Sequence, residues 1–276
     1  MLSFGPMAIE ATFRVIDELS GAPGAGESRS LLLRHQKFAL VLFIVVVVYP
    51  WYYIIGFKTA RLPLENLPTL ELPIDRAWPL HGPWILAYEL VYFFCFLPLC
   101  SIRDTRLFRR LFTGYLLVLL VSFVAFTVYP VKMIRPAFEP SGFLEWGVRL
   151  NHEWDPPVNC FPSVHVGTAY MAALGIWRID RIAGPLAYLG ATAIGFSTMF
   201  VKQHWALDVV GGFAVAHLAW ALFLRGYDRA PLTDAEARLP RRWYLVVFGI
   251  YAAVVLGFWF VYRSGFAPWQ ASQPAV

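Results

Sequence analysis

Two residues that could do chemistry, His204 and Asp208, lie four positions apart at the start of a long apolar stretch. Positions i and i+4 of a helix share one face, so the carboxylate can bind one imidazole nitrogen and leave the other nitrogen free. An imidazole held in this way is a nucleophile or a base. Because ionisable side chains are costly inside a membrane, the pair indicates a functional site.

A second histidine, His165, follows Pro162 and Ser163 at the start of another apolar stretch. Proline and serine are typical of helix starts, and the first turn of a helix offers backbone N–H groups and a positive dipole end to an anion. Two histidines and one carboxylate indicate phosphoryl transfer, in which His204 attacks phosphorus and His165 protonates the leaving oxygen. We therefore predict that His165, His204 and Asp208 are catalytic.

Cationic and hydroxyl side chains close to these residues could bind the phosphate. Lys132 and Arg135 follow the third apolar stretch, and Lys202 lies two positions before His204. Arginine can bind two phosphate oxygens at once, and serine adds a hydroxyl group. We predict four phosphate-binding residues: Lys132, Arg135, Ser163 and Lys202.

The composition is that of an integral membrane protein. Hydrophobic residues make up 58% of the chain, charged residues only 15%, and the mean hydropathy is +0.56, whereas about a quarter of the residues in a soluble domain are charged. Seven apolar stretches approach the roughly 20 residues that cross a bilayer: 38–57, 84–100, 111–129, 163–177, 183–200, 208–224 and 243–262. The predicted fold class is all-α, a polytopic transmembrane helix bundle.

The basic residues predict the orientation of the bundle. Of the 23 Lys and Arg residues, 15 lie before the first span or in the loops 101–110, 178–182 and 225–242. Basic residues in short loops stay on the cytoplasmic side, so the amino terminus is expected there and the catalytic residues on the external side, the periplasm in a bacterium. The net charge of +5 reflects this distribution and an attraction to anionic lipid, and it does not indicate nucleic-acid binding.

We expect one catalytic unit with appended segments. Residues 38–224 would form a six-span catalytic core, and residues 225–276 a cytoplasmic loop and the seventh span. The external loop 58–83 contains too many prolines for a long helix. With the longer external loop 130–162 it is expected to cover the site.

The first 37 residues show no signal-peptide pattern. Ile9, Phe13 and Ile16 fall on one helical face, which predicts either a helix on the inner membrane surface or an unstructured tail. A flexible Gly- and Ser-rich linker is expected at residues 21–28.

Taken together, the motifs resemble the type 2 phosphatidic acid phosphatase superfamily, whose pattern is KxxxxxxRP, PSGH and SRxxxxxHxxxD on a six-helix membrane core. The resemblance covers roughly residues 84–224, so the seventh span would be an addition. Ser163 and His165 match the second motif, and His204 and Asp208 match the third. The resemblance implies a lipid phosphate or phospholipid substrate, a phosphohistidine on His204, proton donation by His165, and no cofactor or metal.

The chain departs from this pattern in three places: the first motif is shortened to Lys132-x-x-Arg135-Pro136, Val164 replaces the glycine of PSGH, and Thr198 replaces the arginine after Ser197. A missing guanidinium weakens phosphate binding unless Lys202 or another cation takes its place. This version of the third motif is more similar to the inositol phosphorylceramide synthase branch, the inositolphosphotransferases. That branch transfers a phosphoryl head group to a lipid alcohol.

Each pattern is common by itself. A His-x-x-x-Asp pair usually stabilises a helix, and basic residues beside a span usually reach from the apolar region to water. The prediction depends on the conjunction, because all three clusters fall at span ends on one side of the membrane. Glu89 could line the site or pair with a neighbouring helix. His152, Glu153 and Asp155 could recognise an acceptor hydroxyl or simply face solvent, and His217 is expected to be a packing residue.

Four functions fit these residues. The first is hydrolysis of a lipid phosphate, and the second is transfer of its phosphoryl group to a lipid alcohol, for example to make a phosphosphingolipid. The two reactions differ only in whether water or an alcohol attacks the phosphohistidine. The third is transport, which the clustering of ionisable residues at one face disfavours. The fourth is vanadate-dependent haloperoxidase activity, found in typically soluble proteins that resemble this chain in motif.

Overall fold

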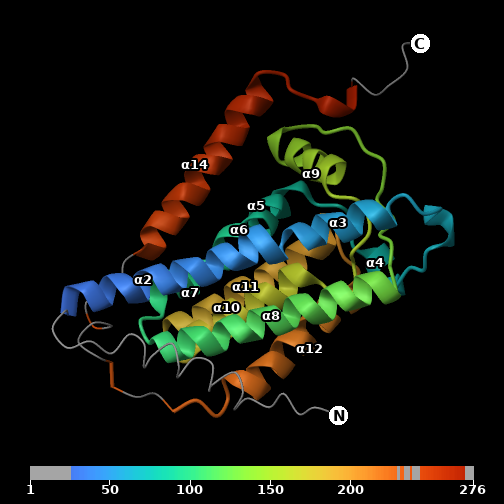
Figure 1. Ribbon diagram of the computed structural model, residues 1–276. Coiled ribbons are helices and arrows are strands. Elements are labelled where there is room, and N and C mark those ends of the chain that lie inside the picture. Colours follow the sequence, from blue (N-terminus) through green and yellow to red (C-terminus); the bar gives the residue numbers. More distant parts are fainter. Residues whose placement is uncertain (1–25, 229–230, 233–236, 238–242, 271–276) are drawn as a thin grey trace.

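The computed structural model describes residues 26–228, 231, 232, 237 and 243–270, and every regular element in this part of the chain is a helix (Figure 1). Within these described residues, four helical segments are long and apolar enough to cross a membrane: His35–Thr59, Thr105–Val128, Ala206–Phe223 and Tyr244–Gln270. The chain is therefore an integral membrane protein. The predicted all-α helix bundle, with a six-helix core and an added C-terminal span, is confirmed.

The first apolar stretch is one nearly continuous rod made of α2 (Gly26–Phe43), the π-helical turn η1 (Ile44–Val48) and α3 (Pro50–Thr59). Pro50 is tolerated because it lies in the first turn of α3, where a backbone N–H is not needed. Helix α2 begins at Gly26, so the predicted linker does not extend to Ser28. The surface helix expected around Ile9 lies outside the described residues.

The second apolar stretch, expected as one span, is divided into α5 (Ile85–Glu89), α6 (Val91–Phe94) and α7 (Leu97–Ser101). Pro98 in the first turn of α7 has no backbone N–H to continue the preceding helix. The other five apolar stretches are each one helix: α8 (Thr105–Val128), α10 (Val164–Trp177), α11 (Ala183–Phe200), α12 (Ala206–Phe223) and α14 (Trp243–Arg263).

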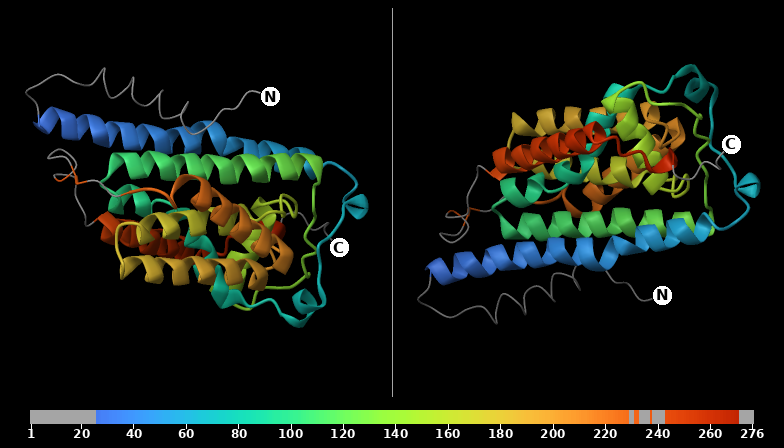
Figure 2. Two further views of the ribbon diagram at one scale, coloured as in Figure 1. Left: turned by 90° about the horizontal axis from the view of Figure 1, so that it is seen from below. Right: turned by 90° about the horizontal axis from the view of Figure 1, so that it is seen from above.

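Helix α10 is the centre of the bundle. It packs against α8, α11 and α12, and all its residues from Val164 to Ile176 except Thr168 are buried. A helix that is apolar on every side is typical of such a position. Helices α2, α3 and α8 lie side by side along one flank of the α10, α11 and α12 group (Figure 2).

A glycine fixes the distance between α10 and α12. A Cβ atom added at Gly212 would lie 2.4 Å from the carbonyl oxygen of Ser163 and 3.2 Å from the backbone nitrogen of Gly167. Only glycine therefore allows α12 to lie so close to the first turn of α10. This contact matters because both helices begin at predicted site residues.

Two loops cover the end of the bundle where α10 and α12 begin. The loop 58–83 holds only η2 (Leu64–Asn66), α4 (Pro73–Ala77) and η3 (Gly82–Trp84), so the expectation that its prolines prevent a long helix is confirmed. The loop 130–162 contains α9 (Phe143–Trp154), and η4 (Pro268–Gln270) follows the last helix. Helix α14 leaves the core and ends beside α9 (Figure 1), where Phe258 and Tyr262 contact the ring of Trp146.

Candidate active site

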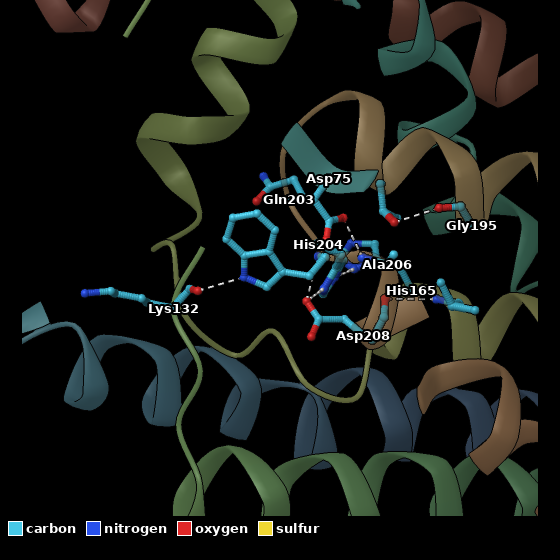
Figure 3. A network of polar contacts seen from close by, with 12 residues as sticks. Asp75, Lys132, His165, Gly195, Gln203, His204, Ala206 and Asp208 are labelled. Atoms are coloured by element: carbon cyan, nitrogen blue, oxygen red, sulfur yellow. Dashed lines mark hydrogen bonds and ion pairs between the residues drawn. The ribbon is translucent and has the colours of Figure 1, made fainter. Parts of the chain in front are cut away.

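The three predicted catalytic residues meet in one buried cluster (Figure 3). His204 lies in the loop between α11 and α12, His165 in the first turn of α10, and Asp208 in the first turn of α12. Nε2 of His204 is 3.4 Å from Nδ1 of His165, and Nδ1 of His204 is 3.4 Å from Oδ2 of Asp208. One imidazole is thus held between a carboxylate and a second imidazole.

Asp208 has two roles in this cluster. Its Oδ2 atom accepts a hydrogen bond of 2.8 Å from the backbone N–H of Trp205, which satisfies one of the free donors at the start of α12. The same oxygen faces Nδ1 of His204, at a distance longer than an ordinary hydrogen bond. Such contacts often tighten when substrate binds. The arrangement favours the His204 tautomer that carries its proton on Nδ1, which leaves the Nε2 lone pair free for attack.

A hydrogen-bonded turn at the end of α11 positions His204. The backbone N–H groups of Gln203 and His204 both donate to the carbonyl of Thr198, at 2.9 and 3.1 Å. Lys202, which directly precedes Gln203, adopts the left-handed conformation, with φ of 57°. Thr198 itself is fully buried and donates its hydroxyl to the carbonyl of Gly195. The residue in place of the expected arginine is therefore a packing residue that shapes the turn.

Ser163 joins the first turns of α10 and α12. Its hydroxyl oxygen accepts a hydrogen bond from the N–H of Val166 and begins α10, while its own N–H donates to the carbonyl of Asp208 at 3.0 Å. The hydroxyl hydrogen is left to donate elsewhere. The serine thus lies where the sequence predicted it, beside the predicted catalytic histidines.

Arg135 is held by three neighbours, one of which, Gln203, directly precedes His204 in the chain. One terminal nitrogen donates to the carbonyls of His152 and Asp155, at 3.0 and 2.7 Å, and the other donates to the side-chain oxygen of Gln203. Its Nε atom is buried and has no hydrogen-bond partner among the described residues. Burial lowers the pKa of Arg135, while Asp155 acts in the opposite direction. A buried guanidinium with a free N–H is suited to an anion.

The two predicted lysines lie elsewhere. The Lys132 ammonium group donates to the carbonyls of Leu64 and Glu65, at 2.6 and 3.1 Å, and in Figure 3 it points away from the histidines. The Lys202 ammonium group donates to the carbonyls of Asp75 and Trp78. Both lysines therefore anchor the loop 58–83, and their phosphate-binding role stays a prediction that these contacts do not favour.

Comparison with known families identifies the group to which this arrangement belongs. A family model described as the PAP2 superfamily matches residues 61–222, well over half of the chain. The chain belongs to the PAP2 superfamily. Membership indicates a phosphatase or phosphotransferase that acts on a phosphate-bearing substrate. No curated protein and no solved structure matches the chain.

The match to the PAP2 superfamily includes all seven predicted site residues, whereas α2, α3 and α14 lie outside it. The arginine of the third PAP2 motif has no cationic replacement at position 198. Among the predicted phosphate-binding cations, Arg135 is the one that bonds to the side chain of Gln203, the residue before His204.

Sequence reasoning missed two tyrosines beside His165. The Tyr88 ring centre lies 4.8 Å from that of His165, and its buried hydroxyl has no partner among the described residues. The Tyr92 hydroxyl lies 3.5 Å from Nε2 of His165. Their spacing of four residues around Glu89 in an apolar stretch was the available signal, because it places both hydroxyls on one helical face.

Asp75 was also missed, and its neighbouring sequence carries no motif. Its Oδ1 atom accepts the N–H of Ala206 at 2.8 Å, and Oδ2 accepts the N–H of Leu72 at the same distance. It ties the loop 58–83 to the start of α12, close to the backbone of His204 (Figure 3). Only the folded chain reveals this contact.

An apolar cavity of about 290 Å³ opens beside His165. It runs between η1, α6, α7, α8 and α10, and its lining on α8 extends from Leu119 to Phe108. That distance is about 16 Å at the rise of an α-helix. Apart from His165, Cys95, Thr168 and several tyrosines, the lining is hydrocarbon. The cavity is suited to one hydrocarbon chain with its polar end at the histidines.

Proposed function

We propose that the protein is a membrane enzyme that takes the phosphoryl group from a lipid phosphate and carries it transiently on His204. The observation that carries the proposal is the line of contacts from Asp208 through His204 to His165, which ends at an apolar cavity. A soluble phosphate ester would not need a cavity of this kind. Its lining also disfavours an ion path, because apart from His165 the described part contains no charged side chain.

In the first half of the proposed reaction, Nε2 of His204 forms a bond to phosphorus as the bond from phosphorus to the lipid oxygen breaks. His165 donates its proton to that leaving oxygen. Asp208 stabilises the positive charge that develops on the His204 ring. Arg135, the hydroxyls of Ser163 and Tyr88, and the first turn of α10 bind the phosphoryl oxygens.

In the second half, water or an alcohol attacks phosphorus, the bond to Nε2 breaks, and His165 takes the proton of the attacking group. Every step uses a side chain of the cluster, so we propose that activity persists in EDTA. We further propose that the site faces the exterior, which the distribution of Lys and Arg supports. Assignment to the inositolphosphotransferase branch rests on the Ser197-Thr198 and Lys202-Gln203-His204 pattern.

The test is turnover by purified protein in detergent with a panel of lipid phosphates, read as release of phosphate and as new phospholipid by mass spectrometry. His204→Ala should lower activity by about four orders of magnitude or more, because the nucleophile is lost. His217→Gln is the matched control, since His217 lies within α12, the helix that follows His204, and contacts Tyr188 and Phe213 instead. Wild-type turnover in the His204→Ala variant would contradict the proposal.

A further inference from the structure

A second cavity, of about 270 Å³, lies next to the first. Tyr52 and Tyr92 line both cavities and therefore form the wall between them. The other walls come from α5, α6, α9 and α14, and they include Glu89, Trp146, Asn151, Asp155, Tyr251 and Phe258. Helix α14 lies outside the region that matches the PAP2 superfamily.

The second cavity is amphipathic, and its polar groups connect to the catalytic cluster. The Asn151 amide donates to Glu89 Oε1 at 3.2 Å and accepts from the Gln203 side chain. Gln203 in turn accepts from Arg135 and directly precedes His204 in the chain. The rest of the lining is mainly aromatic and aliphatic. A ligand with an apolar body and one polar group fits such a cavity.

The two cavities differ in the charged side chains that line them, so they suit different ligands. Two carboxyl groups, Glu89 and Asp155, line the second cavity, whereas no carboxyl group lines the first in the part of the chain described. Asp155 accepts a hydrogen bond from the hydroxyl of Tyr52 at 3.2 Å, and burial raises the pKa of Asp155. In their ionised form these groups repel a phosphate, and no cation among the described lining residues offsets them. A neutral hydroxyl can instead donate a hydrogen bond to them.

We propose that the second cavity binds a neutral lipid alcohol, which accepts the phosphoryl group from His204 and makes the enzyme a phosphotransferase. This inference rests on the proposed function. The alcohol's chain lies along Trp146 and Phe258, and its hydroxyl lies toward Glu89 and Asp155. To react, the hydroxyl passes between Tyr52 and Tyr92, where the Tyr92 hydroxyl already lies 3.5 Å from His165.

The transfer step balances within the cluster. The alcohol oxygen forms a bond to phosphorus, and the bond from phosphorus to Nε2 of His204 breaks with its electron pair returning to the ring. The alcohol proton goes to His165, which lost its own proton in the first half of the reaction. The products are a new phospholipid and free enzyme.

A variant that fills the second cavity tests this assignment. Val255 on α14 lines the cavity, and the adjacent Leu256 is 54% exposed and does not line it. Val255→Trp and the control Leu256→Trp are compared with phosphatidic acid as donor and with ceramide or diacylglycerol as acceptor, both supplied in detergent micelles. Phosphate release and new phospholipid are measured in the same reactions.

The proposal predicts that Val255→Trp raises the KM for the acceptor at least tenfold and leaves both hydrolysis by water and the KM for phosphatidic acid unchanged. Leu256→Trp should change none of these. A raised KM for phosphatidic acid with an unchanged KM for the acceptor would show that the cavity holds part of the donor, and would overturn the proposal.

A wild-type enzyme that hydrolyses phosphatidic acid but forms no new phospholipid with either alcohol would also overturn the acceptor assignment. The proposed function would survive that result. Absence of both reactions across the panel of lipid phosphates would instead contradict the proposed function itself.

Discussion

Nε2 of His204 lies 3.4 Å from Nδ1 of His165, and both rings are buried. The attacking nitrogen of the proposed mechanism therefore faces the proton donor directly. In that mechanism the phosphoryl group enters between the two rings, so we expect binding to separate them. Their present contact keeps the lone pair of His204 oriented until a substrate replaces it.

Asp208→Asn should lower kcat by about two to four orders of magnitude, because a neutral amide no longer stabilises the charge on His204. The amide oxygen can still accept the N–H of Trp205, so α12 should keep its first turn. Stopped-time turnover assays and thermal unfolding in detergent measure the two effects. A variant with unchanged Tm and full activity would show that the carboxylate has no catalytic role.

Arg135→Lys should raise the KM for a lipid phosphate by about ten- to a hundredfold. A lysine cannot reproduce the contacts to His152, Asp155 and Gln203 and still present an N–H to phosphate. The matched control is Lys132→Ala, which removes a cation bound to the carbonyls of Leu64 and Glu65. We expect it to lower Tm and leave KM within about threefold. Equal increases in KM for both variants would instead support the predicted role of Lys132 in phosphate binding.

Gly212→Ala should lower both activity and Tm, because the added Cβ would lie 2.4 Å from the carbonyl of Ser163 and push α12 away from α10. The displacement moves Asp208 relative to His165, so kcat/KM should fall at least tenfold. Gly257→Ala on α14 meets no atom within 4 Å and serves as the control. Normal kinetics in Gly212→Ala would mean that the helices tolerate a wider separation.

His152 gives the protein a pH-dependent stability. Burial and the charge of Arg135 lower its pKa to about 3, and its ring donates Nε2–H to the carbonyl of Val201 at 2.8 Å. The unfolded chain binds a proton at this residue below about pH 6.5, whereas the folded chain does not until about pH 3. The unfolded state therefore binds more protons in this window, and stability falls as pH falls through it.

His152→Gln keeps a donor for Val201 and removes this titration. Asp155, whose pKa is raised, contributes with the opposite sign in both proteins and cancels in the comparison. The difference in Tm between wild type and variant should therefore shrink as pH is lowered from 7 to 4. A constant difference over that range would contradict the assignment of a buried neutral His152.

Apolar length and motif spacing were enough to predict six of the seven helical stretches and the meeting of His165, His204 and Asp208, whereas the second stretch is divided into α5, α6 and α7. The binding partners of the two predicted phosphate-binding lysines depend on long-range contacts that the sequence does not reveal. The sequence positions of Lys132 and Lys202 predict phosphate binding, yet both ammonium groups donate to carbonyls of the loop 58–83, which folds over the site. Their positive charge alone could not reveal which acceptors the folded chain brings near.

The aromatic residues show the same limit. Apolar stretches contain many tyrosines, and periodicity does not tell which of them faces a catalytic ring. Tyr88 and Tyr92 contact His165 only because α5 and α6 pack against the start of α10. The second cavity was equally hidden, since it needs α9 and the separate helix α14 to close it.

The most direct test of the account is the site of the covalent intermediate. Wild-type enzyme is mixed with a lipid phosphate, quenched within one turnover at alkaline pH, and digested for mass spectrometry. The account predicts a phosphoryl group on His204, absent from His204→Ala and from enzyme without substrate. A phosphoryl group on another residue, or continued turnover with His204 unmodified throughout, would contradict it.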